Sequence, residues 1–302
     1  ALLPLALAPL AAGQVAFEKG KDRVRVTIAG RPFTEFVFDA VNNKPYLYPL
    51  RSASGKLVTR HYPFESVPGE DTEHPHHRGI WFTHGDVNGF DFWGSDASQK
   101  GPKQGRVLLD RIVSTEPGEK AGAIVTDFRW LAPGGKVLLR EPRRTVFYSP
   151  PSLRTIDFDL ELTAGPVPVH FGDTKEGTFA VRVGAPLSED NGATLVNSNG
   201  QKSEKNVWGA RADWIDDYGT VEGERMGVAI FDHPSHPRPP TYWHARAYGL
   251  LAANIFGQPD FLNDKSRDGG LTMSPGSTLR FRSRVIIPPG DTAAADIAGL
   301  YG

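Results

Sequence analysis

Histidines gather in two short stretches of this 302-residue chain, and imidazoles are the side chains best suited to moving protons near neutral pH. Seven of the nine histidines lie in residues 74–93 and 232–248: His74, His76, His77, His84, His233, His236 and His244. Random placement would seldom bring so many together. We therefore expect the chemistry of the protein to lie in these two stretches.

The first stretch, EHPHHRGIWFTHGDVNGFDFWG, begins with three closely spaced imidazoles. Pro75 favours an extended backbone at His74, which predicts that His74 and His76 project to one side and His77 to the other. A His-x-His pair on one face is also a candidate edge for a metal site, whose further ligands would come from His84, Asp86, Asp91 or the second stretch. We favour imidazoles that work without a cofactor, and keep a divalent metal held by His74 and His76 as the alternative.

Aromatic residues alternate with these polar groups. A sugar ring needs such a surface, because its C–H face packs on an apolar platform while directional donors and acceptors meet its hydroxyls. Arg78 adds a planar, permanently charged fork that suits a carboxylate or a pair of hydroxyls. We therefore predict a carbohydrate or another small polyhydroxylated ligand, bound in this stretch by His74, His77, Arg78, Asp86 and Trp93. The alternative is that the aromatic residues only fill the core.

The second stretch, FDHPSHPRPPTYWHARAYG, repeats this chemistry. Its prolines predict a loop that carries His233, His236 and Arg238, and the strand that follows places His244 and Arg246 on one face. We expect these five residues to face the ligand together with Trp243 and Tyr248. For each of them, a purely structural hydrogen bond is the alternative.

A third stretch, VPVHFGDTKEGTFAVRV, adds acid and base groups. A carboxylic acid or a neutral imidazole can transfer a proton to or from a sugar oxygen or carbon. We assign Lys175 to binding, and we assign the acid–base steps to His76, His84, Glu176 and His244. An ordinary hairpin turn with a solvated Lys–Glu pair is the competing interpretation.

Composition excludes several other functions. With 34 basic and 35 acidic residues the net charge is −1, which gives no basis for binding nucleic acid. The chain has no cysteine, so thiolate nucleophiles, Cys-ligated zinc and iron–sulfur clusters are excluded. No G-x-S-x-G elbow, P-loop, His-Glu-x-x-His or dinucleotide fingerprint is present, which disfavours acyl-transfer and nucleotide chemistry.

The pattern of turns and alternation predicts an all-β protein. Gly and Pro, at 33 and 25 residues, favour short strands joined by turns. Residues 15–38 alternate as a meander, 107–162 hold four more strand-like runs, and shorter runs follow at 46–50, 57–62, 179–183, 227–231, 242–247 and 277–287. Only residues 291–301 look helical, with Asp291 as the expected N-cap. We predict one large antiparallel β-sandwich over residues 13–302 with a short C-terminal helix.

The first twelve residues, ALLPLALAPLAA, are similar to the apolar region and cleavage site of a secretory signal peptide. We expect a remnant of such a peptide here, and hence export to the periplasm or the cell exterior. No segment of the chain reaches the roughly 18–20 apolar residues that a membrane span needs.

The strings HPHHRGIWFTHGDVNGFDFW, GDTKEGTFAVRV and FDHPSHPRPPTYWHARAYGL resemble a bacterial family that carries the label "methane oxygenase PmoA". The monooxygenase subunit of that name has several membrane spans, so we expect this chain to be a different, soluble protein. The resemblance covers nearly the whole chain after the first twelve residues. It implies an exported protein of carbohydrate-degrading bacteria, with a fold similar to the galactose-mutarotase-like supersandwich.

Three functions remain open at this point. The leading hypothesis is a carbohydrate-active enzyme, a hydrolase, lyase or epimerase acting on a glycoside or modified sugar by His and carboxylate acid–base chemistry. The second is a sugar-binding protein without catalysis. The third is a mononuclear metal oxidoreductase or oxygenase with His74 and His76 among its ligands.

Overall fold

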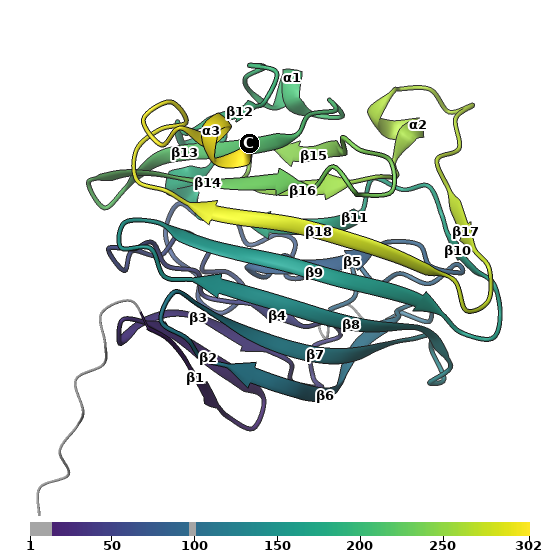
Figure 1. The fold of residues 1–302 in the computed structure, drawn as a ribbon. Helices are drawn as coiled ribbons and strands as arrows, with labels where there is room; N and C mark the ends of the chain where they lie inside the picture. Colours follow the sequence, from purple (N-terminus) through teal and green to yellow (C-terminus); the bar gives the residue numbers. More distant parts are fainter. Residues whose placement is uncertain (1–13, 97–100) are drawn as a thin grey trace, which may run out of the picture.

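The computed structural model describes residues 14–96 and 101–302, and two antiparallel eight-stranded sheets dominate it (Figure 1). The first sheet has, in spatial order, β1 (Val15–Lys19), β2 (Arg23–Ile28), β3 (Arg31–Val37), β4 (Tyr46–Leu47), β5 (Ile80–His84), β11 (Gly177–Arg182), β16 (Leu250–Asn254) and β15 (Tyr242–Arg246). The second has β12 (Thr194–Asn197), β13 (Trp214–Val221), β14 (Glu224–Asp232), β18 (Thr278–Ile287), β9 (Arg154–Ala164), β8 (Val137–Tyr148), β7 (Ala121–Leu131) and β6 (Arg106–Glu116). The predicted all-β class and large antiparallel sandwich are confirmed.

Apolar and polar residues alternate along strands such as β9, and the apolar residues form the main core between the two sheets. In β9, for example, Ile156, Phe158 and Leu160 are buried while the aspartates between them are partly exposed. On the first sheet, Phe82 on β5 and Phe179 on β11 are directly paired, and both belong to the same apolar cluster. Each strand thus has one face toward this core, as its two-residue period requires.

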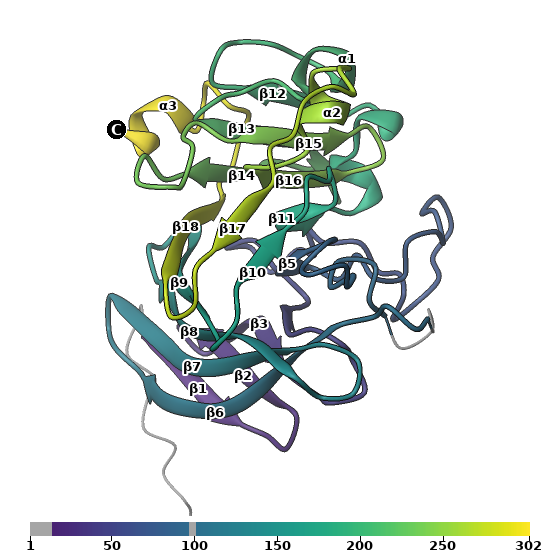
Figure 2. The same cartoon turned by 90° about the vertical axis from the view of Figure 1, so that its right-hand side faces the viewer.

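The opposite, outer face of the first sheet carries a second, smaller apolar cluster with Trp81, Ala180 and Ala252 among its members. Trp93, from the segment between β5 and β6, packs into this cluster. Figure 2 shows the loop between β4 and β5 standing out on one side of the sheets. The strands therefore provide a rigid floor on this face, and loops build walls above it.

Short elements complete the fold. They are β10 (Val169–Phe171) paired with β17 (Leu271–Met273), the 3₁₀ turns η1 (Ala185–Leu187) and η2 (Glu189–Asn191), and the helices α1 (Glu204–Val207), α2 (Gln258–Phe261) and α3 (Ile297–Tyr301). Within the described residues, no helix combines the length and apolar character that crossing a bilayer requires. The predicted signal-peptide remnant, residues 1–12, lies outside the described residues.

Two local predictions need correction. The C-terminal helix begins at Ile297 instead of near Asp291, because Asp296 is its N-cap and accepts a hydrogen bond from the Gly299 N–H. Asp291 instead accepts from the Ala294 N–H in the preceding turn. The strand expected at residues 57–62 is only a pair of isolated bridges, through Leu57 and Thr59.

Candidate functional site

A row of paired residues crosses four strands on the outer face of the first sheet. Trp81 on β5 lies opposite Ala180 on β11, Ala180 opposite Ala252 on β16, and Ala252 opposite His244 on β15. Paired residues of antiparallel strands share a face, so all four side chains point away from the main core. The two alanines are fully buried, and the rings of His77 and Trp93 pack against Trp81 with centroid distances of 5.2 and 5.1 Å.

The HPHH segment forms one wall of the candidate site on this face, and it is a tight turn. The His77 N–H donates to the His74 carbonyl oxygen over 3.0 Å, with Pro75 inside the turn and His74 at a positive φ of 52°. The imidazoles of His74 and His77 consequently stack with ring centroids 4.8 Å apart, and His76 meets His77 edge-on at 4.4 Å. This corrects the extended conformation predicted for the segment, because the turn brings all three imidazoles together.

A buried arginine holds this turn in place. The guanidinium of Arg60, 2% exposed, donates to the carbonyl oxygens of Glu73 and His74 over 2.9 and 2.8 Å and to the Asp71 carboxylate over 2.8 Å. Asp71 also accepts from the buried guanidinium of Arg182. The backbone on which the histidines stand is thus bound to a charged cluster beneath it.

The segment before β11 forms the opposite wall. The carboxylate of Asp173 accepts from the backbone N–H groups of Gly257, Gln258 and Gly269, which anchors the segment to the region around α2. Lys175 and Glu176, each about one-third exposed, form an ion pair at its end. His244 Nδ1 lies 2.8 Å from the Lys175 carbonyl oxygen. Because a carbonyl only accepts, Nδ1 carries the proton in this bond, and Nε2 is left as an acceptor.

These parts enclose a cavity of about 460 Å³, here called the acid–base cavity. It is lined by Glu73, His74, His76, His77, Gly85, Asp91, Trp93, Gly94, Lys175, Glu176, His244, Arg246 and Tyr248. The lining includes predicted site residues from all three stretches of the sequence: His74, His76, His77, Trp93, Lys175, Glu176, His244, Arg246 and Tyr248. Their roles in binding or catalysis stay predictions, and their convergence on one cavity is a property of the structure.

Burial favours the neutral form of three imidazoles in this cavity, those of His74, His77 and His244. It lowers the pKa of His74 and lowers the pKa of His77 well below its ordinary value. It also lowers the pKa of His244 to about 3, a shift that the charge of Lys175 increases. A neutral imidazole has one donor and one acceptor nitrogen, so each of these three rings can both donate and accept a hydrogen bond at neutral pH.

Four predicted residues from the neighbourhood lie outside the acid–base cavity. His84 has the same parity as Ile80 and Phe82, so it faces the interior, where it contacts Phe256 and where its Nε2 lies 2.8 Å from the Gly172 carbonyl oxygen. Trp243 on β15 also faces the main core, where it is buried, and its indole N–H donates to the Ala212 carbonyl. Arg78 pairs with Asp96 and Asn42, and Asp86 accepts from the Gly89 N–H in a turn. The prediction that these four residues share one site with the other histidines is therefore corrected.

The Pro-rich loop, residues 233–241, begins away from the acid–base cavity, because the chain crosses from the second sheet to the first between β14 and β15. His236 is buried, paired with Asp232, and its Nε2 accepts from the Arg282 N–H over 2.7 Å. His233 lines a separate groove on the second sheet, and Arg238 donates to the carbonyls of Gly269 and Gly270. The prediction that His233, His236 and Arg238 share the site of His244 is therefore corrected.

Sequence reasoning missed three basic residues close to the cavity, namely Lys44, Arg60 and Arg182. Lys44 is 3% exposed, donates to the Trp93 carbonyl oxygen and lies 5.4 Å from the Trp81 ring. Burial lowers the pKa of its ammonium to about 7. A signal existed for Arg182, because it lies inside the apolar run GTFAVRV, where an arginine is unusual.

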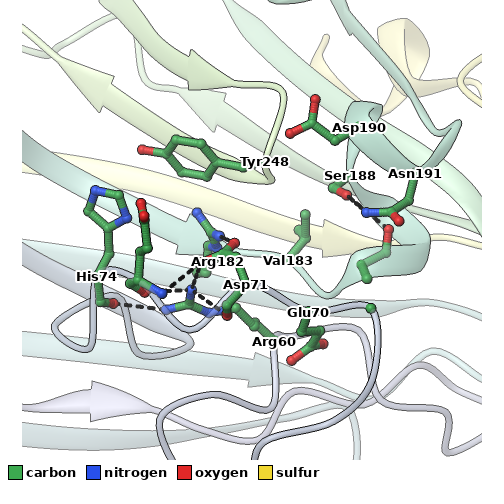
Figure 3. A pocket seen from close by; sticks show the side chains of 13 residues that line it. Arg60, Glu70, Asp71, His74, Arg182, Val183, Ser188, Asp190, Asn191 and Tyr248 are labelled. Atoms are coloured by element: carbon green, nitrogen blue, oxygen red, sulfur yellow. Dashed lines mark hydrogen bonds and ion pairs between the residues drawn. The ribbon is translucent and has the colours of Figure 1, made fainter.

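A second cavity, here called the arginine cavity (Figure 3), shares lining residues with the first. Its volume is about 310 Å³, and its lining is Arg60, Gly69, Glu70, Asp71, Glu73, His74, Arg182, Val183, Ala185, Ser188, Asp190, Asn191 and Tyr248. The Arg182 guanidinium lies 4.2 Å from the centre of the Tyr248 ring. Deep burial, together with the neighbouring charge of Arg60, lowers the pKa of Arg182 to about 10.

The described residues contain no ready-made ligand set for the metal that we kept as an alternative. Within residues 14–96 and 101–302, no three His, Asp or Glu side chains are grouped so that they could hold one metal ion. The rings of His74 and His76 are 5.7 Å apart and nearly perpendicular. The role of the two histidines as metal ligands stays a prediction.

Comparison with known proteins identifies the family. Residues 23–302 match the family of unknown function DUF6807, and the chain belongs to this family. The match assigns no activity, and no curated protein matches the chain.

Solved structures with similar folds are galactose-mutarotase-like proteins. One from Clostridium acetobutylicum shares 10% identity over 91% of this chain and 98% of its own, with a TM-score of 0.45. Another from Lactobacillus casei shares 10% identity over 90% and 99%, with a TM-score of 0.39. A putative aldose 1-epimerase from Escherichia coli shares 10% over 92% and 99%, with a TM-score of 0.33. Likeness of this extent assigns no function to the chain.

Proposed function

We propose that the protein is a carbohydrate-active enzyme that binds a neutral sugar in the acid–base cavity and moves protons on it. One observation carries the proposal: the Glu176 carboxylate, the neutral imidazoles of His77 and His244, and the indole of Trp93 line a single cavity. Proton transfer needs an acid and a base within reach of one ligand, and a sugar ring needs an aromatic surface beside polar groups.

The two walls of the cavity supply different groups. On one wall, the Glu176 carboxylate is ion-paired with Lys175, and His244 offers Nε2 as an acceptor. On the other wall, His76 and His77 face the same space from the HPHH turn. We assign Glu176 and His244 as bases and the histidines of the turn as donors to a sugar oxygen. Hydrolysis, elimination and epimerisation all require such a pair.

Binding groups surround this pair. Asp91 is held rigidly, because one carboxylate oxygen accepts from the N–H groups of Trp93 and Gly94 over 2.8 and 2.9 Å. Its other oxygen is left for a sugar hydroxyl. Arg246 is fixed by Glu204 over 2.9 Å, and its guanidinium lies 5.9 Å from the centre of the Tyr248 ring. These fixed groups would orient the ring before any proton moves.

The test is a turnover screen of the full chain. We would incubate it with glycosides, oligosaccharides and 3-keto-glycosides at pH 5 to 8 and follow products by NMR, which detects cleavage, elimination and epimerisation alike. Glu176→Gln should lower turnover of any substrate found by a factor of about 10²–10⁴. Glu222→Gln is the matched control, since Glu222 is an exposed ion-pair partner of Lys56 away from the cavity.

Two outcomes would count against the proposal. A substrate whose turnover is equal in the wild type and in Glu176→Gln would remove the acid–base assignment. Sugar binding that Glu176→Gln preserves, without product formation under any condition, would favour a binding protein that performs no catalysis.

A further inference from the structure

The acid–base cavity and the arginine cavity share a wall. Glu73, His74 and Tyr248 line both of them. The Tyr248 ring is nearly parallel to the His74 imidazole at 5.4 Å, and its face covers the Arg182 guanidinium at 4.2 Å. Figure 3 shows Tyr248 above Arg182, with His74 on one side and Asp190 and Ser188 on the other. The phenol ring therefore stands where one cavity passes into the next.

We infer that the two cavities are adjoining subsites for one two-unit ligand, a neutral disaccharide or a glycoside with a hydroxylated ring as its second unit. The inference rests on the proposed function, because it places the reacting unit in the acid–base cavity. Their volumes, about 460 and 310 Å³, fall within or near the range of roughly 300–1,000 Å³ typical of small-ligand sites. The bond between the two units would lie beside His74 and Tyr248.

The charge of the arginine cavity specifies a neutral second unit. Two guanidiniums, Arg60 and Arg182, are outnumbered by four carboxylates, those of Glu70, Asp71, Glu73 and Asp190. An anionic unit would be repelled by this surplus of negative charge. Hydroxyl groups both donate and accept, so they suit a wall that offers carboxylate acceptors and guanidinium donors together.

Hydrogen-bond donors of Arg182, which lines this cavity, have no partner among the described residues. Arg182 gives one guanidinium nitrogen to Asp71, while its Nε and Nη1 are buried with no hydrogen-bond partner among the described residues. A buried donor without a partner costs free energy. A hydroxyl entering this space, with a small shift of the Tyr248 ring, would supply the missing acceptor.

Asp190 is the residue that best reports on the second subsite. It lies on η2, is exposed, and its carboxylate makes no hydrogen bond or ion pair within the described chain. It lines the arginine cavity and not the acid–base cavity. Removing its carboxylate should therefore weaken contacts to the second unit without disturbing the fold.

The experiment compares affinities by isothermal titration calorimetry. The probes are glucose, galactose, mannose and xylose, and the disaccharides cellobiose, sophorose, lactose, mannobiose and xylobiose. We expect at least one disaccharide to bind ten-fold or more tightly than its component sugar. Asp190→Ala should reduce this ratio to less than about three-fold, whereas the matched control Asp213→Ala, at an exposed aspartate one residue before β13, should keep it.

The outcomes separate this inference from the proposed function. Equal affinities for the monosaccharide and its disaccharides would overturn the second subsite while turnover that depends on Glu176 still stands. The same holds if Asp190→Ala weakens both members of a pair equally. If no sugar of either size binds, both the subsite and the proposed function fall.

Discussion

His244 Nδ1 donates a hydrogen bond to the Lys175 carbonyl oxygen over 2.8 Å, which joins β15 to the segment that carries Glu176. The bond fixes the tautomer and orientation of the imidazole, so Nε2 is presented as an acceptor. It also fixes the main chain one residue before Glu176. One contact thus positions both groups that we assign as bases.

Replacing His244 should separate its two roles. In His244→Gln the amide can still donate to the Lys175 carbonyl, but it offers no basic nitrogen. We expect kcat for a substrate found in the screen to fall by about 10²–10⁴, with KM changed much less. His233→Gln is the control, because His233 lies on the second sheet. A variant with unchanged kcat would show that His244 takes no part in the chemistry.

Arg60 is expected to act as a positioning residue for the HPHH turn. Lysine cannot reach Asp71, Glu73 and His74 together, because it lacks the planar fork of five N–H donors. Arg60→Lys should lower the free energy of unfolding by about 1–3 kcal/mol. Hydrogen exchange of residues 71–79 should become faster in the variant.

A control for Arg60→Lys is Arg267→Lys, which alters an exposed pair with Asp264. Exposed pairs contribute about 0–1 kcal/mol, so this variant should be close to the wild type. Equal exchange of residues 71–79 in Arg60→Lys and in the wild type would contradict the positioning role.

Acid should destabilise the protein through His84, among other buried histidines. Burial lowers its pKa to about 4, whereas the unfolded chain takes up the proton near pH 6.5. Between these values the unfolded state binds more protons, so the free energy of unfolding falls as the pH falls from about 6.5 to about 4. In His84→Gln this contribution is absent.

The measurement is denaturant unfolding of both proteins at pH 7, 6, 5 and 4. The wild type should lose about 1.4 kcal/mol per pH unit more than His84→Gln between pH 6 and 4. A constant offset between the two proteins at all four values would mean that His84 protonates in the folded state.

Local patterns in the sequence were sufficient to predict many strands of the two sheets and part of the candidate site. Alternation predicted β6 to β9 and the meander of β1 to β3, and it placed His244 and Arg246 on one face. The error at His84 arose because no strand was assigned to residues 80–84; counting from Ile80, its even parity directs it into the core.

Long-range pairing could not be predicted in the same way. The cavity exists because β11 lies between β5 and β16, strands that are far apart in the sequence. The error at His233 and His236 has the same origin, since the loop after β14 crosses from the second sheet to the first. The HPHH turn depends on Arg60, whose role no local pattern reveals.

A buried carboxylic acid that lines neither cavity predicts a pH effect of the opposite sign. Asp217 on β13 is fully buried, and neither of its carboxylate oxygens has a hydrogen-bond partner in the described chain. Burial raises its pKa well above the ordinary value, and the nearby charges of Asp216 and Glu189 raise it further. The folded state therefore keeps a proton that the unfolded chain releases above about pH 4, so the protein loses stability as the pH rises above that value.

Asp217→Asn removes this proton linkage while nearly keeping the volume of the side chain. Relative to the wild type, its free energy of unfolding should rise with pH by up to about 1.4 kcal/mol per unit above pH 4, until the folded carboxyl itself ionises. The slope is the decisive quantity, because any fixed cost of burying the amide cancels from it. Asp213→Asn, at an exposed position four residues earlier, should show no such slope. Parallel stability curves for Asp217→Asn and the wild type from pH 4 to 8 would mean that Asp217 is ionised in the folded protein.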